Sequence, residues 1–171
     1  MSTDLTMSFT VEQTPQQVFD AVNDVRNWWS GTIVGETSAL GAEWTYSVPD
    51  LHFSRFRITE LAPAERVSWL VLDSHLTFVV DKEEWTGTTV RFEITEEGGP
   101  GDSRRTRLTF THEGLTAEQE CYDVCNTAWG QYILGSLRTL IQAGSGRPDF
   151  FSNQESLEAA LSGTVETPSV P

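Results

Sequence analysis

His112 is the titratable side chain whose position in the sequence best suits chemistry. It ends an alternating stretch in which Leu108, Phe110 and His112 share one face of an expected strand. A histidine at the mouth of an apolar cavity can orient a ligand or act as a general acid or base near neutral pH. The alternative is a histidine held by hydrogen bonds, which anchors the turn into the next helix. The sequence leaves both interpretations open.

Other groups that often carry chemistry give weaker signals. We expect His52 and His75 to lie at the surface beside strands, and Cys121 and Cys125, four residues apart on one helix, to be buried reduced thiols. These spacings match no metal site, and we find no dinucleotide glycine motif, serine nucleophile elbow or paired-carboxylate motif. We therefore predict neither a metal nor a cofactor, and whether the protein is an enzyme stays open.

Aromatic residues form the stronger signal, because many of them fall on the expected inward faces of strands and of a helix. Ligand pockets are mainly apolar with a few polar groups that fix orientation, so these rings are candidates to line an apolar chamber. The alternative is a core filled by the same rings. The predicted ligand-binding residues are Trp28, Trp44, Phe56, Trp69, Phe78, Phe92, Phe110, His112, Cys125, Trp129 and Tyr132.

One long helix over Thr116–Ala143 is expected to position much of this set. Thr116 and Gln119 have the spacing of a capping box, and apolar residues then recur in steps of three and four. Gly144 provides a stop signal. So broad an apolar stripe needs a large partner surface, which a curved antiparallel sheet can supply.

Strands and short helices are expected to build that surface. Thr14 and Pro15 predict the start of a helix, and a second helical turn carries Trp28 and Trp29, of which only one can point inward if they lie on a helix. Arg55 and Arg57 are expected on the opposite face from the core, paired with acids, or as a clamp for an anionic ligand if that face curves inward. The expected strands are 7–11, 43–48, 53–61, 66–73, 89–96 and 104–112, with a short additional strand over 76–80.

Size and composition favour one domain with a substantial core. The chain has 171 residues and is 38% hydrophobic. Its net charge of −14 argues against nucleic acid or an anionic membrane as a partner, and no apolar run is long enough to span a bilayer. The polar N-terminus does not resemble a signal peptide, so a cytoplasmic location is expected. We divide the chain into a ligand-binding domain, 1–146, and a C-terminal extension, 147–171, with a short helix and a loose tail.

The order of elements resembles the helix-grip fold of the START/Bet v 1-like (SRPBCC) superfamily, in the branch of the Hsp90 ATPase activator homologue C-terminal domain. The resemblance rests on several local patterns. The resembling segments are Thr14-Pro15 with Val18-Phe19, Trp28-Trp29, Trp85-Thr86-Gly87-Thr88 with Val90 and Phe92, 108–115, and Trp129 with Leu137 and Leu140.

This resemblance implies an α+β fold. A curved antiparallel sheet of about six to seven strands would wrap around a long C-terminal helix, with two short helices after the first strand. It implies binding of an apolar or aromatic small molecule between sheet and helix. Two alternatives stay open: a polyketide-cyclase-like or hydrolase-like enzyme that uses the same pocket, with His112 as the candidate catalytic residue, and a cochaperone-type interaction module that contacts a chaperone. The sequence also leaves a homodimer open.

Overall fold

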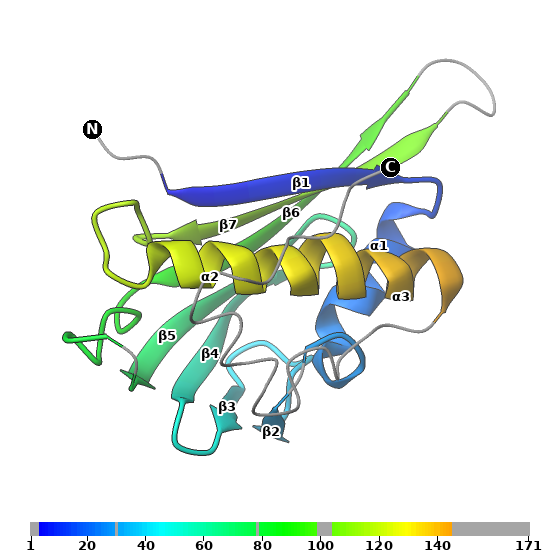
Figure 1. The fold of residues 1–171 in the computed structure, drawn as a ribbon. Helices are drawn as coiled ribbons and strands as arrows, with labels where there is room; N and C mark the ends of the chain where they lie inside the picture. Colours follow the sequence, from blue (N-terminus) through cyan, green and yellow to red (C-terminus); the bar gives the residue numbers. More distant parts are fainter. Residues whose placement is uncertain (1–3, 30, 78, 99–103, 145–171) are drawn as a thin grey trace.

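A seven-stranded antiparallel sheet and one long helix across its inner face make up most of the fold (Figure 1). The computed structural model describes residues 4–29, 31–77, 79–98 and 104–144. Strands dominate the first two thirds of the chain and helices the end, which confirms the predicted α+β class and helix-grip architecture. The predicted domain boundary at 146/147, the extension 147–171 and Phe78 lie outside the described residues.

The sheet has the order β1-β7-β6-β5-β4-β3-β2, so β1 and β2 form its two edges. Breaks in the register between β4 and β5, beside Phe56 and again after Ile58, are irregularities of the kind that bend a sheet. This curvature lets the sheet follow the long helix. The strands are β1 (Leu5–Val11), β2 (Thr32–Gly35), β3 (Glu43–Val48), β4 (His52–Ala62), β5 (Arg66–Leu76), β6 (Thr89–Glu97) and β7 (Arg105–Glu113).

The two short helices after β1 confirm the predicted signals. Helix α1 (Pro15–Asn23) begins with Thr14 as N-cap, and the complete capping box with Gln17 is present. A single 3₁₀ turn, η1 (Val25–Asn27), follows and ends before the two adjacent tryptophans.

The long helix is continuous from Tyr122 to Ala143 but changes its winding. It comprises α2 (Tyr122–Trp129), the π-helical segment η3 (Gly130–Leu137) and α3 (Arg138–Ala143). The predicted start at Thr116 is wrong, because Thr116 and Gln119 contact each other in a separate turn before the helix. The predicted end is confirmed: Gly144 adopts φ of 83°, a left-handed conformation that suits glycine.

Two further differences concern the ends of the sheet. Strand β2 was not predicted, and it pairs with β3 at the edge. The extra strand expected over 76–80 is absent from the described part of that segment, where turns and bends lead away from the end of β5. Within the described ranges, no helix is long and apolar enough to cross a membrane.

Candidate functional site

The predicted ligand-binding residues that the structure describes come together in one interior cluster between the sheet and the long helix. Strand alternation turns the side chains of those that lie on strands to the same face, as period-two patterning requires. All ten are buried. They are Trp28 after η1, Trp44 on β3, Phe56 on β4, Trp69 on β5, Phe92 on β6, Phe110 and His112 on β7, Cys125 and Trp129 on α2, and Tyr132 on η3.

The rings of this aromatic cluster contact one another. Trp44 stacks on Phe56 with ring centroids 4.5 Å apart, and Phe110 packs on Trp129 at 4.6 Å. Trp69 meets the edge of Trp44 at 4.9 Å. An open chamber between sheet and helix is therefore not confirmed, since these rings fill the space that they were expected to surround.

His112 is fully buried, and both of its ring nitrogens have partners. The Trp129 indole N–H donates to Nδ1 over 3.2 Å, and Nε2 lies 2.8 Å from the Thr88 hydroxyl, which itself donates to the Trp85 carbonyl. This pattern fits the neutral tautomer with its proton on Nε2. Burial, with a smaller contribution from the nearby His52, lowers the pKa of His112 from 6.5 to about 3. In this arrangement His112 anchors strand to helix, and it has no free nitrogen for a substrate.

Trp29 is a central member of the cluster that sequence reasoning missed. The expectation that one of two adjacent tryptophans would point away from the core assumed a helix, but η1 ends at Asn27. Both indoles are therefore buried. Trp29 stacks on Tyr46 at 4.2 Å and packs on Trp129 at 5.0 Å, so it links β3 to the long helix.

His52 is also part of the interior, contrary to the prediction of a surface histidine. It begins β4, and its ring lies edge-on to Tyr46 and to Trp85, with centroids 5.1 and 4.6 Å away. Its Nε2 lies 2.7 Å from the Ser54 hydroxyl. Although the residue keeps some solvent contact, burial lowers its pKa to about 3. Alternation along β4 places it on the face of Phe56, but its position beside a turn concealed this.

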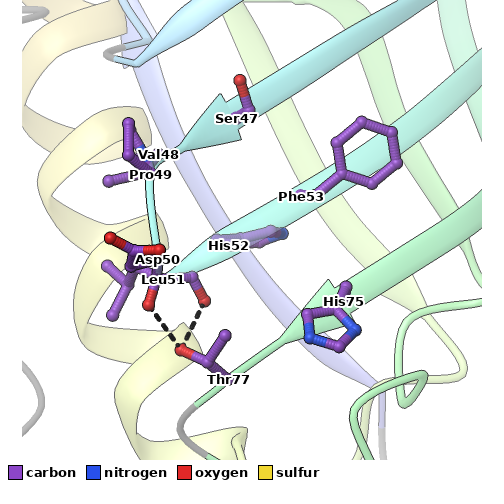
Figure 2. Close-up of a pocket in the computed structure, with 9 residues that line it drawn as sticks. All are labelled: Ser47, Val48, Pro49, Asp50, Leu51, His52, Phe53, His75 and Thr77. Atoms are coloured by element: carbon purple, nitrogen blue, oxygen red, sulfur yellow. Dashed lines mark hydrogen bonds between the residues drawn. The ribbon is translucent and has the colours of Figure 1, made fainter.

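An open pocket of about 320 Å³ lies on the solvent side of His52, where the β3–β4 turn meets the end of β5 (Figure 2). The Thr77 hydroxyl donates to the carbonyls of Asp50 and Leu51 and holds that turn. His75, predicted at the surface, is exposed and forms part of the wall. The pocket is lined by Ser47, Val48, Pro49, Asp50, Leu51, His52, Phe53, His75 and Thr77.

Two indole groups inside the cluster lack hydrogen-bond acceptors. The N–H groups of Trp44 and Trp69 are buried and have no partner. The Trp85 N–H faces the Cys125 sulfur, a weak acceptor, without satisfactory hydrogen-bond geometry. Because most buried polar groups in proteins are paired, these N–H groups are unusual and could receive an acceptor atom from a ligand.

The two cysteines are free and buried, as predicted. Burial raises the pKa of the Cys125 thiol, which keeps it protonated and unreactive near neutral pH. Within the described ranges, no three His, Cys, Asp or Glu side chains gather as a metal site would require.

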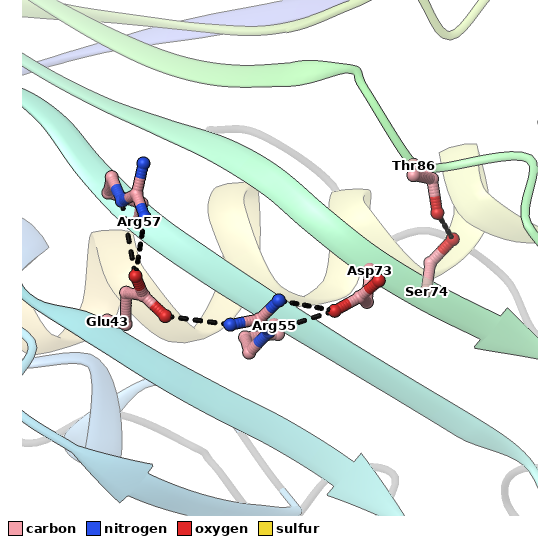
Figure 3. A network of polar contacts seen from close by, with 6 residues as sticks. All are labelled: Glu43, Arg55, Arg57, Asp73, Ser74 and Thr86. Atoms are coloured by element: carbon pink, nitrogen blue, oxygen red, sulfur yellow. Dashed lines mark hydrogen bonds and ion pairs between the residues drawn. The ribbon is translucent and has the colours of Figure 1, made fainter.

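The opposite face of the sheet carries the ion pairs that were predicted for Arg55 and Arg57 (Figure 3). Glu43 accepts from both guanidinium groups, and Arg55 also pairs with Asp73 at 2.6 Å. Hydrogen bonding from Arg57, reinforced by Arg55, lowers the pKa of Glu43. These arginines are therefore neutralised by neighbouring acids and turn away from the aromatic cluster.

A curved antiparallel sheet gripping a long C-terminal helix over an aromatic interior defines a helix-grip domain of the START/Bet v 1-like superfamily. The family model described as "Activator of Hsp90 ATPase homolog 1-like protein" matches residues 12–142. The chain therefore belongs to this family, as its sequence patterns predicted. No curated protein matches the sequence.

Several solved structures share the fold at low identity. The Aha1 dimer from Colwellia psychrerythraea is 20% identical with a TM-score of 0.61, covering 84% of this chain and 99% of that one. A protein from Staphylococcus saprophyticus is 15% identical with a TM-score of 0.55, covering 85% and 96%. DynU16, from the dynemicin biosynthetic locus, is 16% identical with a TM-score of 0.51, covering 83% of this chain and 48% of that one.

Proposed function

We propose that the protein binds an apolar or aromatic small molecule in the interior between the sheet and the long helix. The observation that carries this proposal is the aromatic cluster, in which the Trp44 and Trp69 N–H groups are buried without acceptors. A buried polar group left unpaired costs about 1–3 kcal/mol. A ligand that brings an acceptor into this aromatic environment would offset part of that cost.

The winding of the long helix supports the same location. The π-helical segment η3 lies directly after Trp129 and carries Tyr132, and both rings contact Trp29 in the cluster. π-Helical turns cost stability relative to α-helix and occur frequently at functional sites. On this proposal a ligand enters from the open pocket beside His52, whose ring contacts Trp85 at 4.6 Å.

The geometry favours binding over catalysis. A cyclase-like or hydrolase-like reaction through His112 needs a ring nitrogen near the substrate, and both nitrogens of His112 are already engaged. The enzymatic alternative and the cochaperone-type alternative therefore stay predictions. The homodimer also stays a prediction, although a structure of similar fold is described as a dimer.

Titration with uncharged aromatic probes tests the proposal. We expect 2-naphthol to cause a saturable change in tryptophan fluorescence. Trp69→Phe keeps an aromatic ring but removes the N–H, and should weaken binding by up to about tenfold if that group donates to the probe. Leu40→Ser is the matched control, because Leu40 is a large apolar side chain exposed outside the cluster.

Two results would count against the proposal. One is the absence of saturable change with any aromatic probe in the wild-type protein. The other is a loss of binding in Leu40→Ser as large as in Trp69→Phe, which would indicate association with exposed apolar surface instead of the interior.

A further inference from the structure

Trp85 is held less firmly than the other tryptophans of the aromatic cluster. Trp44 and Trp69 belong to strands and Trp129 to α2, whereas Trp85 comes from the run of turns 82–87 between β5 and β6. Trp28 and Trp29 also lie outside strands and helices, but the Trp28 N–H donates to the Val22 carbonyl, and Trp29 is packed among rings of β3, β4, β5 and the long helix. Its side chain is only 3% exposed. Backbone hydrogen bonds tie the two ends of the segment to β5, from Leu76 to Lys82 and from Gly87 to Val71. Outward movement of residues 83–86 between these ends would break neither a strand nor a helix, so Trp85 is the indole that can leave the cluster with least disruption.

The residues in contact with Trp85 define the space that would open if its ring moved outward. Its ring stacks on Trp129 with centroids 5.8 Å apart and planes 9° apart. The edges of His52 and His112 approach it at 4.6 and 4.8 Å. Because His52 also lines the open pocket, loss of the Trp85 ring would leave one imidazole between that pocket and the centre of the cluster.

One carboxylate holds this segment against the long helix. Glu84 accepts the backbone N–H groups of Glu120 and Cys121 over 2.9 and 3.0 Å, just before α2 begins. A carboxylate suits the N-terminal end of a helix, where unpaired N–H groups and the helix dipole attract negative charge. A second contact joins the hydroxyls of Thr86 and Ser74 at 2.9 Å (Figure 3). Glu84 therefore acts as a latch that joins the turn segment to the helix.

Outward movement would also free a polar group at the same place. The Thr88 hydroxyl donates to the Trp85 carbonyl and lies 2.8 Å from Nε2 of His112. If the Trp85 carbonyl moves away, the hydroxyl proton needs another acceptor, while His112 can still donate to its oxygen. An oxygen on the incoming ligand is the natural replacement.

We propose that Trp85 occupies the ligand site in the free protein and that Glu84 latches it there. This proposal rests on the proposed function. The ligand class is a planar aromatic molecule with an acceptor oxygen, such as a phenol or an aryl ketone. Its ring replaces the Trp85 indole on Trp129, and its oxygen accepts from Thr88.

The test follows Trp85 directly by ¹⁹F NMR of protein labelled with 5-fluorotryptophan, with its signal assigned from Trp85→Phe. We expect 2-naphthol to shift the Trp85 signal to a solvent-exposed position. Glu84→Ala should increase the association rate of 2-naphthol by about tenfold, since a charged hydrogen-bond pair is lost. Glu83→Ala is the matched control, because it removes the same charge from an exposed neighbour outside the latch.

The role of the oxygen is tested separately. Naphthalene, which lacks it, should bind about tenfold more weakly than 2-naphthol, and Thr88→Val should remove most of that difference. Circular dichroism establishes that each variant is folded, and Glu84→Gln provides a less disruptive second latch variant.

The outcomes separate the two proposals. Saturable binding of 2-naphthol with an unmoved Trp85 signal, or equal association rates in Glu84→Ala and Glu83→Ala, would overturn the latch and leave ligand binding intact. No binding in the wild type, together with none in Trp85→Ala, where the indole space is vacated, would overturn both.

Discussion

The neutral state of buried His112 predicts a specific dependence of stability on pH. In the folded protein its pKa is lowered to about 3, mainly by burial, from 6.5. Between these values the unfolded chain binds a proton at this position and the folded protein does not. The free energy of unfolding must therefore fall as the pH decreases from 6.5 towards 3.

The magnitude follows from the lowered pKa. At pH 5, about 1.5 pH units below the ordinary histidine value, one such group should destabilise the fold by about 2 kcal/mol. His112→Gln removes the titration while keeping one donor and one acceptor for Thr88 and Trp129. His52 remains in both proteins, so its own effect largely cancels in the comparison.

Urea denaturation at pH 7 and pH 5 measures the effect. The variant should be less stable than the wild type at pH 7, because glutamine fits the site less well. The wild type should lose about 2 kcal/mol more than the variant between the two pH values. Equal losses, or an NMR titration in which His112 protonates near pH 6.5 in the folded protein, would refute the reasoning.

Three further predictions concern the frame around the site. Thr14→Ala should destabilise the protein by about 1 kcal/mol in thermal or urea unfolding, since the capping box of α1 is lost; no change would mean that the cap is dispensable. Gly144→Ala should also destabilise by about 1 kcal/mol because φ is 83°, and unchanged stability would show that the C-cap relaxes freely. Arg55→Ala should shift the urea midpoint only slightly, and less in high salt, because the side chain is 41% exposed beside Glu43 and Asp73; a large shift would contradict this assignment to a surface network.

Local sequence signals predicted the parts of the fold that local interactions determine. Thr14 and Gln17 form their capping box because both partners lie within one turn. The start of the long helix was misplaced because the residues just before Tyr122 are held by Glu84, which is far away in the sequence. The short spacing between Thr116 and Gln119 predicted a helix start but produces a separate turn.

The composition of the buried aromatic cluster was predictable, but its packing was not. Period-two alternation placed Trp44, Phe56 and Phe110 on the inner face, and the structure confirms their burial. The same alternation cannot show whether rings enclose a space or fill it, since that depends on contacts between distant strands. Trp29 was missed because it follows a 3₁₀ turn and does not lie on a helix. His52 was missed because the expected strand began at residue 53, one residue after the true start of β4.

The central claim is that the interior under the long helix accepts an aromatic guest. Intermolecular nuclear Overhauser effects between bound 2-naphthol and the protein test this most directly. We expect contacts from the naphthol ring to Trp129 and His52, which pack against the Trp85 indole in the free protein. Contacts confined to exposed side chains such as Phe53 and His75, with none to Trp129, would contradict it.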